Sequence, residues 1–296
     1  RNGSRSSGPA CGMTWGRLAR GFGLLGAPVM GSAVSDRQKP QRRSLATGFC
    51  IIPHDRKRHF GGEDACFATS YGMGVADGVS GSRSARADPR EYAVQFMQAC
   101  EDFGRETWDV LQTLRHAQKA TISLASATAC ILLTSDTGVE AANLGDSGWR
   151  WYRNGNLVQG SREQVHYFNC PFQVSRQNPE IVNQAEVKSL EVEQGDILIA
   201  ASDGVYDNLF DDEITGLVRL NKEKGPQALA TDIATLAYNR SLDESAETPF
   251  EVEATKHGYR FHGGKQDDIC VVVGVVSTEQ PPDTDKKKTE QPTSKL

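Results

Sequence analysis

Short apolar segments that resemble β-strands follow one another at tight turns through the middle of this 296-residue chain. They occupy residues 126–135, 138–145, 148–153 and 156–160. Asn154-Gly155 separates the last two and suits a two-residue hairpin turn, which requires positive φ at both positions. Consecutive hairpins of this kind indicate an antiparallel sheet. The fold must therefore contain such a sheet, with other elements covering its faces.

Further strands and helices are expected on both sides of this block. The additional strands are expected at residues 47–54, 64–78, 186–193, 197–202 and 267–276, and the helices at residues 90–103, 105–120, 211–225 and 226–241. Asp88-Pro89 marks the start of the first helix. Trp108, Leu111 and Leu114 recur at helical spacing, which predicts that they face a core. Because long helices are few, they must cover the outer faces of the sheet.

Composition excludes several classes of protein. The net charge of −5 gives no general basic field, so we expect no nucleic-acid partner. No segment approaches the roughly 20 apolar residues of a membrane span, so we expect no span. The seven cysteines lack CxxC spacing, which favours buried thiols in a reducing compartment over disulfides or a zinc site. Apolar residues make up 38% of the chain, enough for the core of an enzyme-sized domain.

The composition changes near both ends of the chain. Residues 1–35 contain arginines among Ser, Gly and Ala but no Asp or Glu, which is typical of an organellar transit peptide; a disordered segment is the alternative. The last twenty residues lack aromatic side chains and are rich in Pro, Lys and Thr, which predicts a disordered tail. We therefore expect a transit or disordered segment over 1–44, a folded domain over 45–276 and a tail over 277–296.

Acidic residues stand at the ends of several predicted strands. Asp77-Gly78 and Asp203-Gly204 each close an apolar segment, Asp267-Asp268 precede another, and Glu63-Asp64 precede a fourth. A single Asp-Gly pair is ordinarily a turn, but the strand ends of a sheet sandwich can bring several acids together. Without a cation such carboxylates would raise one another's pKa, whereas Mg²⁺ and Mn²⁺ prefer oxygen ligands. The pattern therefore predicts a divalent-metal site.

The tetrapeptide Gly-Asp-Ser-Gly at residues 145–148 allows two interpretations. The same quartet surrounds the nucleophilic serine of trypsin-like proteases, which would make Ser147 a nucleophile. That mechanism needs a histidine base oriented by an aspartate. Here the quartet runs directly into a predicted hairpin, and His54, His59 and His116 stand in no recognisable base motif. We therefore expect no protease triad, and Asp146 becomes the residue of interest.

Six motifs, in this order, resemble those of the metal-dependent protein phosphatases of the 2C type: GGEDACF, GVADGVSG, SATACILL, AANLGDSGW, AASDGVYDNLF and GGKQDDICVVV. The resemblance covers roughly residues 45–276 and is strongest to the organelle-targeted branch. It implies an α+β fold, a four-layer α/β/β/α sandwich in which two antiparallel sheets pack face to face with helices on both outer faces. It also implies a monomeric or weakly associating enzyme of the mitochondrion or plastid.

The activity that the resemblance implies is hydrolysis of phosphoserine and phosphothreonine in phosphorylated protein substrates. The cofactor would be Mg²⁺ or Mn²⁺, two ions per chain, with room for a weaker third. The ions would activate a water that attacks phosphorus in line with the leaving oxygen, without a protein nucleophile. The implied metal-binding residues are Glu63, Asp64, Asp77, Gly78, Asp146, Asp203 and Asp267.

Within this set the roles differ. Asp77 would bridge the two ions and Gly78 would offer its carbonyl, while Glu63 would hold one ion directly or through water, with Asp64 beside it. Asp203 and Asp267 would complete the other site, and Asp77 and Asp203 are the residues predicted to be catalytic. Asp146 would lie close by, in reach of the weaker third site. Ser147 would then be a structural turn residue.

Two positions depart from the broader family. Many members have a histidine directly after the bridging Asp-Gly, proposed as general acid, where this chain has Val79. Many place an arginine four residues before the first glutamate to bind phosphate, where this chain has His59. Arg58 and His59 are the predicted phosphate-binding residues, with Arg56 and Lys57 as neighbouring candidates and a solvated basic loop as the alternative. These departures leave open a pseudophosphatase that binds phosphoproteins without hydrolysing them.

Overall fold

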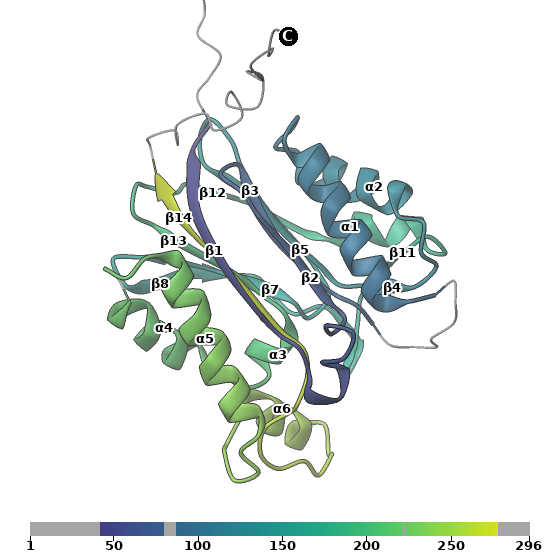
Figure 1. Ribbon diagram of the computed structural model, residues 1–296, viewed down its shortest axis with the longest axis vertical. Helices are drawn as coiled ribbons and strands as arrows, with labels where there is room; N and C mark the ends of the chain where they lie inside the picture. The colour runs from purple at the N-terminus through teal and green to yellow at the C-terminus, as the bar shows by residue number, and fades with distance from the viewer. Residues whose placement is uncertain (1–41, 80–86, 222, 278–296) are drawn as a thin grey trace, which may run out of the picture. The chain divides into compact units, whose positions relative to one another are not determined.

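Two five-stranded antiparallel sheets form the centre of the computed structural model, which describes residues 42–79, 87–221 and 223–277 (Figure 1). The first sheet consists, in spatial order, of β1 (Ser44–Ile52), β14 (Ile269–Ser277), β13 (Ile197–Ala201), β7 (Gly148–Arg153) and β8 (Asn156–Gly160). The second consists of β12 (Glu186–Leu190), β6 (Val139–Leu144), β5 (Ala129–Thr134), β3 (Gly72–Asp77) and β2 (Asp64–Ala68). All pairings within both sheets are antiparallel, as the hairpin pattern predicted.

Helices cover the outer face of each sheet. Against the second sheet lie α1 (Pro89–Gly104) and α2 (Val110–Ala120), and against the first lie α4 (Asp211–Leu220) and α5 (Pro226–Ser241) (Figure 1). Two shorter helices, α3 (Asp203–Tyr206) and α6 (Pro249–Lys256), lie near one end of the sandwich. These layers confirm the predicted α/β/β/α architecture.

Shorter elements complete the described residues. They are the 3₁₀ turns η1 (Asp55–Lys57) and η2 (Pro179–Gln184), the pair β4 (Ser126–Ala127) with β11 (Val174–Ser175), and the pair β9 (Val165–Tyr167) with β10 (Cys170–Pro171). The expected leading segment and tail lie almost wholly outside the described residues. Among the described elements, every helix is too short or too polar to cross a membrane.

Strand β13 shows why its sequence is apolar throughout. Leu198 and Ala200 face the opposite sheet, whereas Ile199 and Ala201 face the helices α4 and α5. Successive strand residues point to opposite faces, so a strand covered on both sides needs apolar residues at every position. The two faces of this sheet therefore contribute to two separate cores, one between the sheets and one under the helices.

The predicted hairpin between β7 and β8 is confirmed. Asn154 and Gly155 have φ values of 51° and 74°, the left-handed conformation that a type I′ turn requires at both positions. The predicted start of α1 is confirmed as well, since the Asp88 side chain accepts hydrogen bonds from the backbone N–H of Arg90 and Glu91.

Two predictions about the helices were wrong. The second helix begins only at Val110, because the Asp109 side chain caps it by accepting from the N–H of Gln112. Trp108 therefore precedes the helix and is 40% exposed under the Arg42 guanidinium, whereas Leu114 is buried as expected. Helix α6 was missed, although Thr248 supplies the side-chain cap that begins it.

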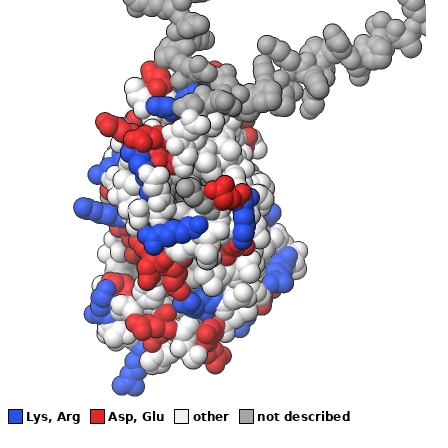
Figure 2. Space-filling model, turned by 90° about the vertical axis from the view of Figure 1, so that its left-hand side faces the viewer, with Lys and Arg blue, Asp and Glu red and all other residues white. Residues whose placement is uncertain are grey.

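Charged side chains of both signs are interspersed on the face drawn in Figure 2. All six cysteines in the described ranges have free thiols. Burial raises the pKa of the Cys100 and Cys130 thiols, which suits inert core positions rather than nucleophiles.

Candidate metal centre

The predicted acids gather at one end of the sheet sandwich. Asp64, at the start of β2, is the direct cross-strand partner of Asp77, at the end of β3. Asp203 follows β13, and Asp267 precedes β14, which is paired with β13 in the same sheet. Antiparallel pairing thus places strand ends from distant parts of the sequence side by side. The structure brings together the acids that the strand-end pattern singled out.

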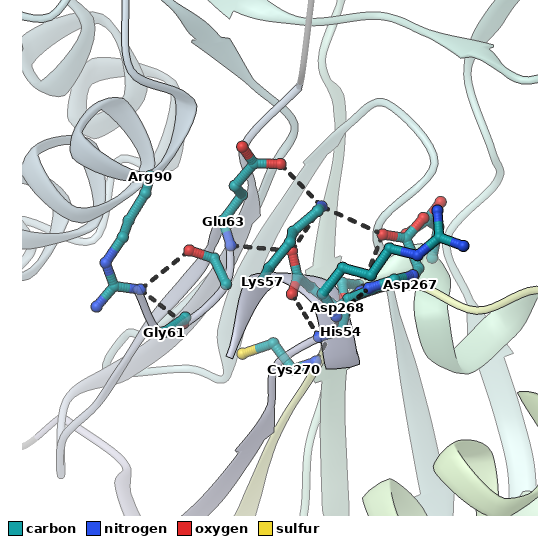
Figure 3. A network of polar contacts seen from close by, with 12 residues as sticks. His54, Lys57, Gly61, Glu63, Arg90, Asp267, Asp268 and Cys270 are labelled. Atoms are coloured by element: carbon teal, nitrogen blue, oxygen red, sulfur yellow. Dashed lines mark hydrogen bonds and ion pairs between the residues drawn. The ribbon is translucent and has the colours of Figure 1, made fainter. Parts of the chain in front are cut away.

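Two glycines before Glu63 allow the chain to turn over this end. Gly61 and Gly62 have φ values of 89° and 78°, and a Cβ atom at Gly62 would lie 2.5 Å from Oδ1 of Asp268. Arg90 donates from Nη1 to the carbonyl oxygens of Gly61 and Gly62 at 2.7 and 3.2 Å (Figure 3). The turn therefore requires glycine, and α1 holds it in place.

Gly78 lies at another close approach of the backbone. Its N–H donates to the carbonyl of Glu63 at 3.2 Å, and a Cβ atom at this position would lie 2.6 Å from the carbonyl oxygen of Pro89 and 2.7 Å from that of Glu63. Only glycine fits between these two segments. The position suits a residue whose backbone carbonyl, rather than side chain, is used.

Asp268 connects several segments beside the acid cluster through hydrogen bonds. It is 1% exposed, and its carboxylate accepts hydrogen bonds from the backbone N–H of His54 at 2.8 Å and of Glu63 at 2.9 Å (Figure 3). The Lys57 ammonium lies 2.8 Å from the same carboxylate and 2.8 Å from Oε2 of Glu63. Asp268 is thus a supporting residue that fixes the loop carrying Glu63.

Asp203 has a different environment. It is 7% exposed, and its Oδ2 lies 2.7 Å from the ammonium of Lys265, which also lies 2.6 Å from Oδ2 of Asp207. The backbone beside Lys265 is fixed by Asn208, whose side-chain amide donates to the Lys265 carbonyl at 2.8 Å and accepts from its N–H at 3.0 Å. Lys265 therefore reaches the cluster from a segment whose backbone is hydrogen-bonded to Asn208.

Several buried carboxylate oxygens lack a hydrogen-bond donor among the described residues. They are both oxygens of Asp64, Oδ1 of Asp146 and Oδ1 of Asp203. The Ser202 hydroxyl lies near Asp64 but outside hydrogen-bond geometry. Burying a carboxylate oxygen without a partner is costly. A divalent cation with oxygen ligands would satisfy these atoms, so the residues present fit such an ion.

The arrangement is open rather than a closed cage. Within the described ranges, no three side chains of the His, Cys, Asp or Glu type already surround one point in a coordinating arrangement. Mg²⁺ retains several waters and needs only one or two carboxylates. Carboxylate oxygens without a hydrogen-bond donor, distributed over several neighbouring acids, are therefore compatible with ions that keep part of their hydration shell.

The crowded carboxylates perturb one another. Burial raises the pKa of Asp64, Asp77 and Asp146 well above the ordinary value, and the neighbouring acids raise it further. Burial would raise the pKa of Asp203 too, but the Lys265 ammonium outweighs it and holds this pKa below the ordinary value. Burial raises the pKa of Asp207 to about 7 in spite of Lys265. The cluster as a whole favours added positive charge.

The GDSG segment supports this site with Ser147. The Ser147 hydroxyl is 2.7 Å from Oγ1 of Thr128, which accepts a hydrogen bond from the N–H of Asp77 at 3.0 Å. Ser147 itself is 1% exposed. A serine buried in this way suits the structural role expected for it. Asp146 has a buried Oδ1 without a hydrogen-bond partner among the described residues, and it is close enough to Asp203 and Asp77 for their charges to raise its pKa.

Among the described contacts of the basic loop before Glu63, those with the acids of the cluster come from Lys57. Arg58 lies 2.9 Å from Oδ1 of Asp55 and 3.0 Å from the hydroxyl of Tyr238, and His59 packs edge-on against the ring of Phe60. Lys57 is the side chain that reaches the carboxylates. Sequence reasoning named Lys57 as a neighbouring candidate but missed Lys265, which stands two residues before Asp267 in the GGKQDDI motif.

A cavity of about 210 Å³ adjoins the acids. Asp146 and Asp207 form part of its wall beside Phe168, from the turn between β9 and β10, and Phe250 of α6. The two phenylalanine rings contact each other with their centroids 5.2 Å apart. Loops that are distant in sequence thus meet next to the carboxylates.

Comparisons with known proteins agree with this geometry. Residues 65–236 match the family model described as protein phosphatase 2C. The chain is 38% identical over 245 residues to "Probable protein phosphatase 2C 55" of Arabidopsis thaliana, covering 80% of this chain and 52% of that protein. It covers 59% of a second Arabidopsis relative, so it spans little more than half the length of the first curated relatives it matches.

Solved structures share the fold. The X-ray structure of the photosystem II phosphatase PBCP is 32% identical, with a TM-score of 0.73, covering 79% of this chain and all of that one. The catalytic domain of the serine/threonine protein phosphatase PstP, in complex with two manganese ions, is 16% identical with a TM-score of 0.57, covering 79% of this chain and 99% of that one. The second likeness concerns the fold alone.

Proposed function

Because the chain belongs to the protein phosphatase 2C family, we propose that it hydrolyses phosphoserine and phosphothreonine in protein substrates with the help of bound divalent metal ions. The observation that carries this proposal is the set of buried, unpartnered carboxylate oxygens at the end of the sandwich. They belong to the motifs by which the sequence resembles the family. A relative with a solved structure is a phosphatase named for photosystem II, which supports a phosphoprotein substrate.

The residues that would hold two ions are those of the strand-end acids, namely Glu63, Asp64, Asp77, the carbonyl of Gly78, Asp203 and Asp267, with Asp146 near a weaker third ion. Bound Mg²⁺ or Mn²⁺ supplies the Lewis acidity that activates water toward phosphorus and neutralises charge on the phosphoryl oxygens. The chain itself orients these acids, through the pairing of β2 with β3 and the hydrogen bonds to Asp268. PstP, which shares the fold, was solved in complex with two manganese ions.

The sequence begins with an acid-free, arginine-containing segment, and we propose an organellar location, in a mitochondrion or plastid. The photosystem II phosphatase among the structural relatives supports it. We also propose that the chain acts as a monomer, because the metal centre draws all its acids from a single chain.

A pseudophosphatase is the second candidate, because two features of the local structure depart from the family pattern. Val79 stands where many members have a histidine, and its N–H is used to bond the carbonyl of Ser126 at 3.0 Å. His59 packs on Phe60 instead of reaching the acids. A protein lacking both groups could bind phosphoproteins without turnover.

Phosphate release from a phosphothreonine peptide by the full chain, with Mn²⁺ or Mg²⁺ titrated, separates the two candidates. We expect phosphate release that depends on the metal. EDTA should abolish it, and the Asp203→Asn variant should lack it. Asp232→Asn is the matched control, since the ion pair of Asp232 with Lys224, at 3.8 Å, is exposed. Metal-loaded, folded protein that binds the peptide without releasing phosphate would instead establish the pseudophosphatase.

A further inference from the structure

Two lysines project into the acid cluster from different parts of the chain. Lys57 belongs to η1 and lies 2.8 Å from both Glu63 and Asp268. Lys265 belongs to the segment before β14 and lies 2.7 Å from Asp203 and 2.6 Å from Asp207. Each ammonium group therefore contacts two carboxylates at hydrogen-bond distance.

Asp267 lies between the two lysines. Its Oδ1 is 3.7 Å from the ammonium of Lys57 (Figure 3). Its Oδ2 is 3.6 Å from the ammonium of Lys265. Glu63, Lys57, Asp267, Lys265 and Asp203 thus form a chain of alternating charge. This chain connects the acid at the start of the second sheet with the acid at the end of β13 in the first sheet.

The acidic side chains of the cluster outnumber the two lysines. The carboxylates of the cluster are those of Glu63, Asp64, Asp77, Asp146, Asp203, Asp207, Asp267 and Asp268, against two ammonium groups. Buried acids at such density are unfavourable without cations. The lysines are therefore a fixed part of the neutralisation, and metal ions would supply the rest.

Lys265 leaves Asp203 available to a further ligand. It contacts only Oδ2 of Asp203, while Oδ1 is buried without a hydrogen-bond partner in the described residues. The side chain of Lys265 is 16% exposed and passes over the ring of Phe250, 4.9 Å from its centroid. The lysine and a metal ion can therefore share this carboxylate, one at each oxygen.

We propose that Lys265 is a positioning residue, a resident cation that orients Asp203 and keeps the acid cluster assembled when no metal ion is bound, with Lys57 acting in the same way on Glu63. The inference rests on the metal centre of the proposed function but not on turnover. Lysine and metal then neutralise the same carboxylates. Loss of the lysine must cost the metal-free protein more stability than the metal-loaded protein.

A thermodynamic cycle follows from this difference. If Lys265→Met destabilises the metal-free state more than the metal-loaded state, the variant must bind the metal more tightly than the wild type. The hydrogen bonds of Asn208 to the backbone of Lys265 stay in place in the variant, so the loop keeps its position. The side-chain charge is what the substitution removes.

Thermal unfolding and calorimetric Mn²⁺ titration of the full chain test the inference. We expect Lys265→Met to lower Tm by about 4 °C or more in EDTA, to recover most of that loss in saturating Mn²⁺, and to bind Mn²⁺ on the order of tenfold more tightly. Lys57→Met should change the same quantities in the same direction. Lys224→Met, which removes an exposed ion pair with Asp232, should match the wild type in both conditions.

Three outcomes of these measurements would contradict the inference. If Lys265→Met lowers Tm equally with and without Mn²⁺, Lys265 contributes packing and not charge neutralisation. If Lys265→Met binds Mn²⁺ more weakly than the wild type, Lys265 does not neutralise the carboxylates in place of the ion. Wild-type protein that binds no Mn²⁺ overturns this inference together with the metal centre. Protein that shows the expected coupling but releases no phosphate supports the inference and contradicts only the proposed reaction.

Discussion

The aspartates at the two ends of β13 are both buried but have opposite surroundings. Asp196, before the strand, is 2% exposed, and its oxygens accept from Nε1 of Trp151 at 2.9 Å, from Nη2 of Arg153 at 2.8 Å and from the N–H of Glu193 at 2.8 Å. Asp203, after the strand, has one oxygen on Lys265 and the other without a donor among the described residues.

This difference separates a structural carboxylate from a ligand-binding one. Burial would raise the pKa of Asp196, but hydrogen bonds from Arg153, Glu193 and Trp151 outweigh it and hold the pKa below the ordinary value. The fold satisfies that aspartate completely. At the other end of β13 the Lys265 ammonium also holds the pKa of Asp203 below its ordinary value, but burial and neighbouring acids raise the pKa of Asp64 and Asp146. Oxygens of all three carboxylates have no hydrogen-bond partner among the described residues, and a bound cation would supply one.

The largest expected effect is on activity. Asp203→Asn should lower metal-dependent phosphate release by at least about 10²-fold, because outer-sphere partners of a metal already cost 10- to 100-fold and Asp203 would hold an ion directly. Asp196→Asn, at the other end of the same strand, should leave the turnover of folded protein unchanged. Initial rates normalised to folded protein check both. Equal losses in the two variants would contradict the comparison.

For stability, the larger loss is expected for Asp196→Asn rather than Asp203→Asn. Asp196→Asn should lower the free energy of unfolding by about 2 kcal/mol at pH 7, because it weakens charge-assisted bonds to Arg153 and Trp151, with some screening at the partly exposed arginine. Urea unfolding at equilibrium measures this. A loss below about 0.5 kcal/mol would mean that the Asp196 network is not structural.

The Asp196 effect should also depend on pH in a defined direction. The folded-state pKa of this carboxyl is lowered, so its stabilisation is present above the unfolded-state pKa near 4 and is lost as pH falls through the lower folded-state value. The difference in unfolding free energy between wild type and Asp196→Asn should stay constant from pH 7 to about 5 and shrink below about pH 4. A difference that grows in acid would contradict this sign.

In the cluster, removal of a charge should stabilise the metal-free protein. Burial and neighbouring acids raise the pKa of Asp146, so its ionised form costs the folded state free energy at neutral pH. Asp146→Asn should therefore raise Tm in EDTA by about 2–4 °C, as a gain of about 1 kcal/mol would. Differential scanning calorimetry in EDTA measures it, and a fall in Tm would show that Asp146 is already satisfied.

The smallest effect is expected at Ser147. Ser147→Ala removes one hydrogen bond to Thr128 and should cost about 1 kcal/mol in stability, with activity within about threefold of the wild type. If Ser147→Ala lost as much activity as Asp203→Asn, the structural role assigned to Ser147 would be contradicted and a catalytic role supported.

Much of the fold could be predicted because its signals are local. The Asn154-Gly155 turn, the Asp88-Pro89 helix start and the apolar strands each depend on near neighbours in sequence. Trp108 shows the limit. Its spacing with Leu111 suits a helix, but the Asp109 cap starts the helix after it, and the side chain pairs with Arg42 instead.

The acids of the site could be named from the sequence, but their partners could not. Strand-end position and motif order indicate Asp77 and Asp203, whereas the contacts of Lys57 and Lys265 depend on how η1 and the segment before β14 approach the same sheet ends. The sequence around Lys57 or Lys265 does not indicate which carboxylates each lysine contacts. The saturation of Asp196 by Trp151 and Arg153 is likewise visible only across paired strands.

Calorimetric titration of Mn²⁺ into wild-type protein, Asp196→Asn and Asp203→Asn tests whether Asp203, rather than Asp196, binds a metal ion. We expect saturable binding by the wild type and by Asp196→Asn, and loss of at least one ion by Asp203→Asn, because of these two aspartates only Asp203 has a buried oxygen without a hydrogen-bond partner among the described residues. Equal Mn²⁺ binding by all three proteins, or none by the wild type, would contradict it.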